Sequence, residues 1–291
     1  EVKVIEKDEQ NTDKSDQSNK EDTTTNNNKA TNNQFVNVYV GEDNIPVAKT
    51  TNSNGITLDS SVYNSKLRVT NNKPQILIYH SHSCETYSDS PKGNYHSEDK
   101  DHSVMSVGCL LTNQLSNLGW GVVHSTTFHD SPTYNNSYAR SAETIKSVMN
   151  QYNDVNITID LHRDGLNIAN QATKNNIHNK YTTTINGEKV AKFFFVVGAR
   201  NDDVEKVQKL ADGLTEYAKK KYPDLIMPVV LKPYGRFNQS ISDNAILVEV
   251  GSNGTTTAEA QASAKYIAQV IDGYFKEQDI KNNWERINKC L

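Results

Sequence analysis

Short apolar runs separated by helical patterns constrain the fold of this chain more than any other feature. The first run covers residues 75–79, and the next strong runs cover residues 155–161 and 245–250. Each has the length of a strand that is buried on both faces, as in a parallel sheet. Between the first two runs, residues 104–118 carry Val and Leu at helical spacing, and Gly119 follows at the position of a C-terminal cap. The alternation predicts an α/β fold, with a central, mostly parallel sheet and helices on both faces.

Weaker patterns extend this prediction along the chain. They predict strands at residues 120–124 and 226–231, a hairpin that joins 182–185 to 192–197 through Asn186-Gly187, and helices over 138–152, 204–217 and 258–275. Residues 35–40 and 56–69 carry short alternating apolar patterns, which predict peripheral strands. We therefore expect one domain over residues 35–291, with its core at about residues 74–275.

Residues 1–34 are too polar to contribute to that domain. They hold only four apolar side chains among runs of Asn and Thr, so we predict a disordered linker there. This segment carries eight acids and five lysines, so it accounts for three of the four net negative charges of the chain. The remainder is nearly neutral and shows no basic stripe, which disfavours nucleic acid as a partner.

The sequence contains little evidence of membrane-spanning helices or of functional cysteines. No run approaches the 18 apolar residues typical of a transmembrane helix. The sequence starts without Met, so an anchor or export signal upstream stays open. Three cysteines without C-x-x-C spacing predict neither a disulfide framework nor a thiolate zinc site. Cys84 is interpreted as a small neighbour of the predicted site rather than as a nucleophile.

Ionisable side chains stand at three of the predicted strands. His82 and Glu85 follow the first strand, His162 follows a later one, and Glu249 lies inside another. The carboxyl ends of parallel strands meet at one edge of a sheet, so we expect these groups to converge. Two imidazoles and one carboxylate are a ligand set of catalytic zinc sites, so we predict Zn²⁺ bound by His82, Glu85 and His162. Glu249, costly to bury without a partner, is the predicted general acid and base.

Neighbouring residues are predicted to support this site. His80 lies two residues before His82 and is assigned a role beside the ligands or at the substrate, with direct ligation in place of His82 as the alternative. Asp160 is placed to accept the second ring N–H of His162. A structural ion pair of Glu249 with Arg163 or Arg236 is the competing interpretation of that carboxylate.

The other histidines are predicted to be solvated: His96, His102, His124, His129 and His178. His102 is retained as a substitute for the carboxylate ligand.

Four separated motifs resemble one known family. They are Ile-Leu-Ile-Tyr-His80-Ser-His82-Ser-Cys-Glu85-Thr-Tyr, Ile-Asp160-Leu-His162-Arg-Asp164, Gly235-Arg236-Phe-Asn238-Gln239 and Ile-Leu-Val-Glu249-Val-Gly-Ser-Asn253. In this order they resemble stage II sporulation protein P, a family of peptidoglycan hydrolases related in fold to the zinc N-acetylmuramoyl-L-alanine amidases. The resemblance implies cleavage of the amide between N-acetylmuramic acid and L-alanine during engulfment of the forespore, and also of peptide cross-links.

The same resemblance implies a setting and a set of site residues. It implies a membrane anchor before the linker, an extracytoplasmic location between forespore and mother cell, and two partners, the lytic transglycosylase stage II sporulation protein D and the membrane scaffold protein M. His82, His162 and Glu249 fall on the ligand and catalytic positions of related amidases. Their carboxylate ligand comes from the following helix, which offers no Glu here, so either Glu85 serves or the ligand set differs. Arg163, Arg236 and Asn253 are assigned to substrate binding or support of the site.

Two other functions use the same residues. A metallopeptidase of carboxypeptidase type has the same ligand set and needs a cationic pocket, for which Arg163 and Arg236 are the candidates. A wall-binding module with a degenerate metal site is the alternative without catalysis.

Overall fold

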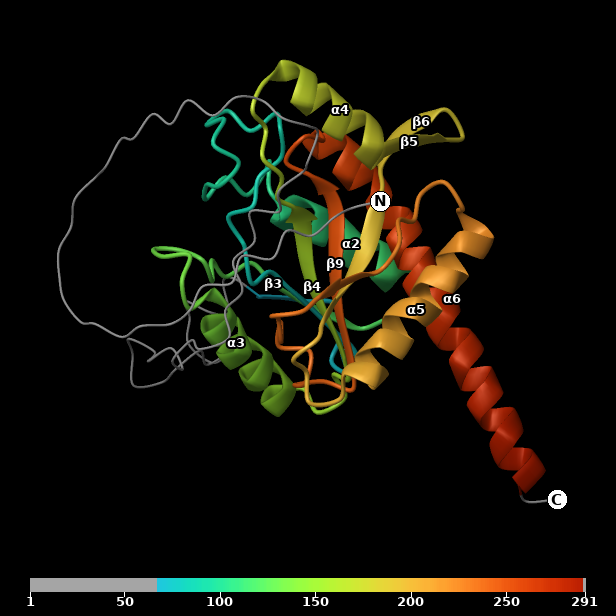
Figure 1. Ribbon diagram of the computed structural model, residues 1–291. Coiled ribbons are helices and arrows are strands. Elements are labelled where there is room, and N and C mark those ends of the chain that lie inside the picture. Colours follow the sequence, from blue (N-terminus) through green and yellow to red (C-terminus); the bar gives the residue numbers. More distant parts are fainter. Residues whose placement is uncertain (1–66, 290–291) are drawn as a thin grey trace. The chain divides into compact units, whose positions relative to one another are not determined.

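The computed structural model describes residues 67–289, with side-chain environments up to residue 279 (Figure 1). The predicted linker at 1–34, the strand at 35–40 and most of the strand at 56–69 lie outside the described residues. The central sheet has seven strands in the order β1-β3-β2-β4-β9-β7-β8. Their bounds are β1 Leu67–Val69, β2 Ile76–Tyr79, β3 Val122–Ser125, β4 Ile157–Asp164, β7 Phe193–Gly198, β8 Val230–Lys232 and β9 Asn244–Ser252.

The middle of this sheet is parallel, as the sequence predicts. Strand β2 runs parallel to β3 and β4, and β4 runs parallel to β9. Two antiparallel pairings flank this parallel centre: β1 on β3, and β7 on β9. The predicted α/β class with a mostly parallel central sheet is confirmed. In that sheet β2, β4 and β9 lie side by side, so their carboxyl ends share one edge.

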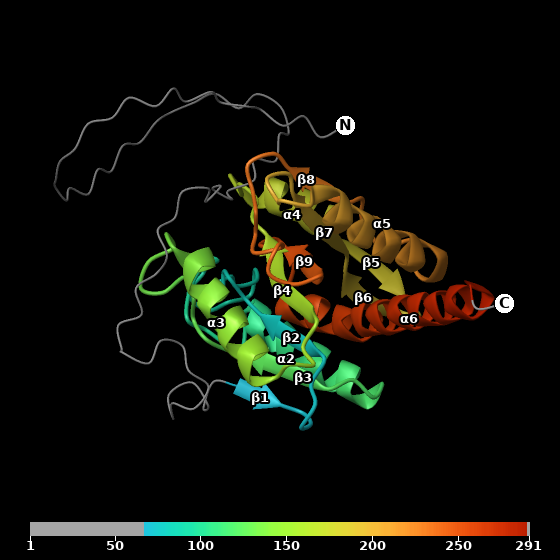
Figure 2. The same cartoon turned by 90° about the horizontal axis from the view of Figure 1, so that it is seen from below.

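Helices cover both faces of the sheet. They are α2 (Val104–Asn117), α3 (Ser137–Gln151), α4 (Gln171–Tyr181), α5 (Val204–Lys221) and α6 (Thr257–Lys289). Side chains alternate along β2, so Ile76 and Ile78 join the core that contains α2 and α6, whereas Leu77 and Tyr79 join the one that contains α3. Figures 1 and 2 show α3 and α6 on opposite sides of the sheet. Among the described helices, none is both long enough and apolar enough to cross a bilayer.

The predicted hairpin forms with a different second strand. β5 (Thr182–Ile185) pairs antiparallel with β6 (Glu188–Ala191), so the loop is the two residues Asn186-Gly187 alone. Both loop residues have positive φ, 51° and 81°, which suits the tight turns of two-residue hairpins. Residues 193–198 form β7 in the central sheet instead, because their side chains are buried along the whole strand. The prediction that residues 192–197 complete the hairpin is therefore wrong.

Two further elements differ from the predictions. Helix α4 was not expected, because only Ile177 and Tyr181 of its residues are buried and the apolar period is correspondingly weak. The strand expected at 226–231 is shorter and later, since Ile226 makes only an isolated bridge to Phe193 before β8 begins at Val230.

Candidate functional site

The three predicted metal ligands come together at the edge formed by the ends of β2 and β4. Ligand atoms of His82, Glu85 and His162 all lie within 4.8 Å of one another. His82 Nδ1 is 3.7 Å from Glu85 Oε1, and His162 Nδ1 is 3.4 Å from Glu85 Oε2. All three residues are buried. Two imidazoles and a carboxylate at this spacing fit the donor set of a zinc ion with an open coordination position.

The orientation of His162 is fixed by Asp160, two residues earlier on β4. His162 Nε2 lies 2.9 Å from Asp160 Oδ1, which leaves Nδ1 facing Glu85. Asp160 is held in turn by Ser81, whose backbone N–H donates to Oδ1 at 2.8 Å and whose hydroxyl donates to Oδ2 at 2.7 Å. A carboxylate behind a ligating histidine fixes the ring tautomer, and this is the contact expected for Asp160.

Charge in the cluster is balanced around His162. Burial lowers the pKa of His162, but the carboxylates of Asp160 and Glu85 outweigh burial and raise that pKa well above its ordinary value. Burial likewise raises the pKa of Glu85, yet Arg163 and His162 bring it well below the usual range. The site therefore stabilises a positive charge between two carboxylates, which is the electrostatic condition that a divalent cation requires.

Glu85 is placed by the turn that follows β2. Its backbone carbonyl accepts from Val104 N–H at 3.0 Å, so the turn is tied to the start of α2. Its side chain accepts from the backbone N–H of Arg163 at 3.0 Å. The guanidinium of Arg163 donates to the carbonyls of Thr86 and Tyr95, at 3.0 Å and 2.6 Å. Arg163 therefore holds the turn that carries Glu85.

Aromatic rings pack against His82. The ring of Tyr134 stacks on it with centroids 4.4 Å apart, and the Tyr134 hydroxyl lies 3.2 Å from His82 Nδ1. Tyr138 meets the same imidazole edge-on at 5.2 Å. Burial lowers the pKa of His82, which favours the neutral ring that a metal ligand must be. Sequence reasoning missed both tyrosines, because they come from the 126–136 connection and from α3 rather than from a strand end.

Glu249 lies on β9 directly opposite His162 in the strand register. Burial raises its pKa to about 8, with the negative charges of Asp164 and Glu85 adding to the effect and His162 opposing it. Its Oε2 is buried and has no hydrogen-bond partner among the described residues. Arg236 pairs with Asp202 at 2.9 Å on the surface, and Arg163 pairs with Glu85. The described contacts thus do not support the structural ion-pair alternative for Glu249.

A cavity of about 420 Å³ opens over this group. Glu85, His162 and Glu249 line it, so two of the three candidate ligands and the candidate acid and base face one space. Lys232, at the end of β8, is half-buried and also lines the cavity; sequence reasoning missed it, since a single Lys in a short strand carries no sequence signal. Asn253 lines it as well and braces the loop after β4, because its amide bonds both the N–H and the carbonyl of Leu166.

The structure does not bring His80 or Arg236 to the cavity lining. His80 is fully buried, with Nδ1 2.8 Å from the Leu161 carbonyl oxygen and Nε2 3.0 Å from His124 Nε2. Burial lowers the pKa of His80 to about 4. Arg236 is half exposed at the surface beside Asp202. The alternative in which His80 replaces His82 as a ligand therefore finds no support in the ligand cluster.

The other histidines divide into two groups. His124 and His129 are fully buried, so the prediction that they are solvated is wrong. His124 sits on β3 beneath α2, and His129 hydrogen-bonds the His80 carbonyl and Thr144. His96, His102 and His178 are each partly exposed: His96 lines the cavity, His102 pairs with Asp99 at 2.8 Å, and His178 pairs with Glu259 at 2.8 Å. His102 does not belong to the ligand cluster, so its use in place of the carboxylate ligand finds no support there.

Together the fold and the site define an α/β protein with a cavity at the carboxyl ends of its central strands and, beside that cavity, a His–Glu–His cluster of candidate metal ligands. Residues 1–272 match the family model described as Stage II sporulation protein P (SpoIIP). The chain belongs to that family. It is 28% identical over 228 residues to the Stage II sporulation protein P of Bacillus subtilis (strain 168), which covers 74% of this chain and 54% of the relative. The chain thus spans about half the length of this curated relative.

Two solved structures are similar to this chain at low identity. One is an N-acetylmuramoyl-L-alanine amidase from Clostridium difficile 630, 16% identical, with a TM-score of 0.42 over 71% of this chain and 97% of that one. The other is an N-acetylmuramyl-L-alanine amidase from Mycobacterium abscessus, 15% identical, with a TM-score of 0.41 over 70% and 99%. These values establish no shared activity.

Proposed function

We propose that this chain is a zinc-dependent peptidoglycan hydrolase that cleaves the amide between N-acetylmuramic acid and the L-alanine of the stem peptide. One observation carries the proposal: His82, Glu85 and His162 cluster beside a cavity that Glu85, His162 and Glu249 line. Membership of the sporulation family supports a wall substrate. When bound, zinc would polarise the scissile carbonyl and lower the pKa of a coordinated water to about 7.

The residues of the chain supply the remaining chemistry. Asp160 accepts the N–H of His162 Nε2 and so keeps the proton on that nitrogen, which leaves the lone pair of Nδ1 available to bind the metal. Glu249 takes a proton from the attacking water at its carboxylate and delivers it to the leaving nitrogen. Burial raises the pKa of this carboxyl to about 8, and the positive charge of a bound zinc would oppose that rise, so the same group can accept a proton from water and release it to the leaving nitrogen near neutral pH.

Binding of the substrate falls to the cavity walls. Tyr95, Tyr134 and Phe237 offer flat apolar surface for a sugar ring or a peptide, and Lys232 offers a cation for the carboxylates of the stem peptide. Cleavage of peptide cross-links, anchoring to a membrane in the extracytoplasmic space, and action with stage II sporulation proteins D and M belong to the same proposal. They rest on the resemblance of the motifs.

The two alternatives are weaker on specific contacts. A carboxypeptidase-type enzyme needs a cation at the substrate terminus, and neither predicted arginine supplies it, because Arg163 is held by backbone carbonyls and Arg236 by Asp202. Lys232 is the cation in the cavity lining that this alternative would have to use. A degenerate wall-binding module would lack part of the machinery, whereas all three ligand candidates and Glu249 are in place.

Digestion of purified sacculi and of defined muropeptides tests the proposal. Mass spectrometry of the products should show intact stem peptides released from glycan strands, in a reaction that requires zinc. Peptides shortened at the carboxyl end would indicate the peptidase instead. Binding to sacculi with no soluble product from zinc-loaded protein would overturn the proposal and leave the wall-binding module.

A further inference from the structure

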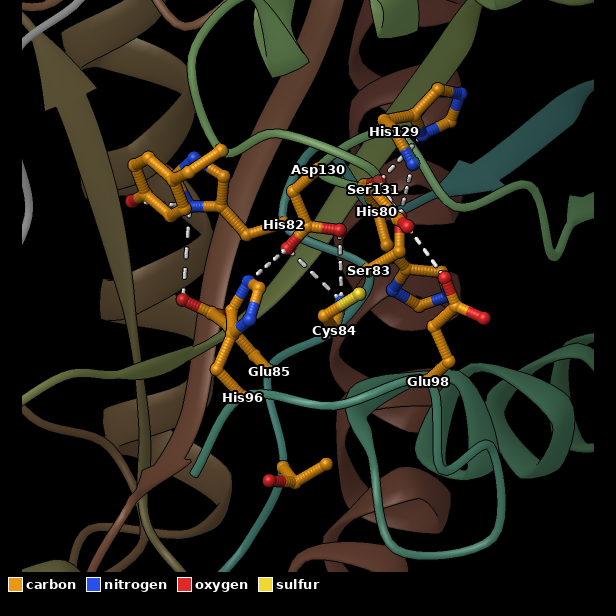
Figure 3. Close-up of polar contacts among 12 residues, drawn as sticks. His80, His82, Ser83, Cys84, Glu85, His96, Glu98, His129, Asp130 and Ser131 are labelled. Atoms are coloured by element: carbon orange, nitrogen blue, oxygen red, sulfur yellow. Dashed lines mark hydrogen bonds and ion pairs between the residues drawn. The ribbon is translucent and has the colours of Figure 1, made fainter. Parts of the chain in front are cut away.

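A second cluster of metal-ligating side chains lies beside the first. Cys84, His96 and Asp130 bring a thiol, an imidazole and a carboxylate within 4.8 Å of one another. They come from the turn after β2, from the loop before α2 and from the connection after β3, so no local spacing reveals them. Figure 3 shows the Asp130 carboxylate reaching both His96 and the backbone of Cys84.

Hydrogen bonds pre-organise this cluster around Asp130. Its Oδ1 and Oδ2 accept from the backbone N–H of Cys84 at 3.0 and 3.1 Å. Its Oδ2 also lies 3.0 Å from His96 Nε2. Asp130 and Cys84 are buried, whereas the side chain of His96 is 43% exposed and lines the cavity. A cation thus has preformed donors inside and an entry route past His96.

Negative charge surrounds Cys84. The carboxylates of Asp130, Glu98 and Glu85 all act on its position. Glu98 is held nearby by the hydroxyl of Ser131, at 2.5 Å. Their negative potential attracts a divalent cation, and the positive charge of that cation in turn stabilises a thiolate bound to it.

We propose that Cys84, His96 and Asp130 bind a second zinc ion, through Cys84 Sγ, an imidazole nitrogen of His96 and a carboxylate oxygen of Asp130. On binding, the Cys84 thiol releases its proton to solvent and the Sγ–Zn bond forms, with no change of oxidation state. Thiolate and imidazole donors select zinc over magnesium or calcium, which prefer oxygen. The ion links three separate loops, and because Cys84 precedes Glu85 directly, it would stiffen the turn that carries that first-site ligand.

Cobalt(II) substitution distinguishes the two sites, because only the second has a sulfur ligand. The measurement uses the full chain with Cys109→Ser and Cys290→Ser, so that Cys84 is the single thiol of the protein. The expected result is two cobalt ions per chain and a thiolate-to-cobalt charge-transfer band in the near ultraviolet. Adding Cys84→Ser should remove the band and one ion, and adding His96→Ala, at a half-exposed position, should do the same. His82→Ala should remove one ion and keep the band.

The outcomes separate this inference from the proposed function. Two results would overturn the second site. One is a cobalt-saturated protein without a thiolate band, and the other is a cobalt content that does not change with Cys84→Ser and His96→Ala. If the second site is overturned in this way, loss of one cobalt ion with His82→Ala would still support the first site. Retention of the thiolate band together with a metal content unaffected by His82→Ala would instead support the second site and count against the first.

Discussion

His162 and Glu249 are register partners on the neighbouring parallel strands β4 and β9. Register partners point to the same face of a sheet, so a candidate metal ligand and a candidate proton carrier face one cavity. The register shifts directly afterwards, between His162 and Asp164. Such an irregularity re-aims the following side chains.

Glu249→Gln should abolish turnover and keep the metal. The amide preserves the size of the side chain but removes the proton acceptor, so we expect kcat to fall by at least about 10²-fold. Zinc content measured by elemental analysis should equal that of the wild type. Full activity of Glu249→Gln on muropeptides would remove Glu249 from the mechanism.

Asp160→Asn should weaken zinc binding through His162. Loss of the carboxylate behind a ligating histidine costs about 10–100-fold in metal affinity. Competition with a chromogenic chelator measures this affinity. Asp99→Asn is the matched control, because Asp99 forms a similar pair with His102 away from the ligand cluster. Equal affinities for both variants would contradict the role of Asp160.

Zinc should raise the thermal stability of the protein through the His82 site. Binding to the folded state alone stabilises it by about 2.7 kcal/mol when free zinc is 100 times the dissociation constant. We expect Tm of the Cys84→Ser variant to fall on chelation and to recover with zinc but not with magnesium. The added His162→Ala substitution should abolish this response. A Tm that is unaffected by chelation would count against the site.

His129 should make the folded state less stable in acid. Burial lowers its pKa from 6.5 to about 4, while its ring bonds the His80 carbonyl and the Thr144 hydroxyl. Between these pH values the unfolded chain binds a proton that the folded chain rejects. Stability therefore falls as pH decreases from 6.5 to 4, by up to about 1.4 kcal/mol per unit from this residue.

Urea unfolding at a series of pH values checks the contribution of His129. The informative quantity is the slope of the unfolding free energy against pH, which measures how many more protons the unfolded chain binds than the folded chain. In His129→Gln this number should decrease by about one. A lower overall stability of the variant does not affect this comparison. An unchanged slope would show that His129 is protonated equally in both states.

Gly108→Ala should destabilise the fold beneath the site. A Cβ at Gly108 would lie 2.7 Å from His124 Nε2 and 2.9 Å from the ring of His80, both of which are fully buried. Overpacking of this kind costs about 1–3 kcal/mol, against a gain of up to about 1 kcal/mol from the helix preference of Ala. Gly213→Ala on α5 is the control, because its neighbour there is the outer end of the Tyr274 ring. Denaturant unfolding should separate the two variants by at least about 1 kcal/mol.

Much of the site was predictable because its residues adjoin strands with strong local signals. The apolar runs that became β2, β4 and β9 are buried on both faces, and a parallel sheet brings the carboxyl ends of such strands, with His82, His162 and Glu249, to one edge. The link from Asp160 to His162 follows from alternation along a single strand. These inferences need only periodicity and the parallel pairing rule.

Other features carry no such signal. His124 and His129 resemble boundary residues in sequence, yet the packing of α2 and α3 against the sheet buries them completely. Residues 193–198 follow a turn and resemble the return strand of a hairpin, but their burial on both faces places them in the central sheet. In each case neighbours distant in sequence decide the outcome.

The sequence by itself determined the fold class, the central strands and the group of candidate ligands that follows them, because these depend on short-range periodicity. Only the tertiary structure decided that His96 and Asp130 meet Cys84, that Tyr134 covers His82, and that Lys232 faces the cavity. These contacts join loops and strand ends whose path depends on long-range packing. Local patterns of apolar and polar residues do not encode that path, since each loop is positioned by the elements it connects rather than by its own residues.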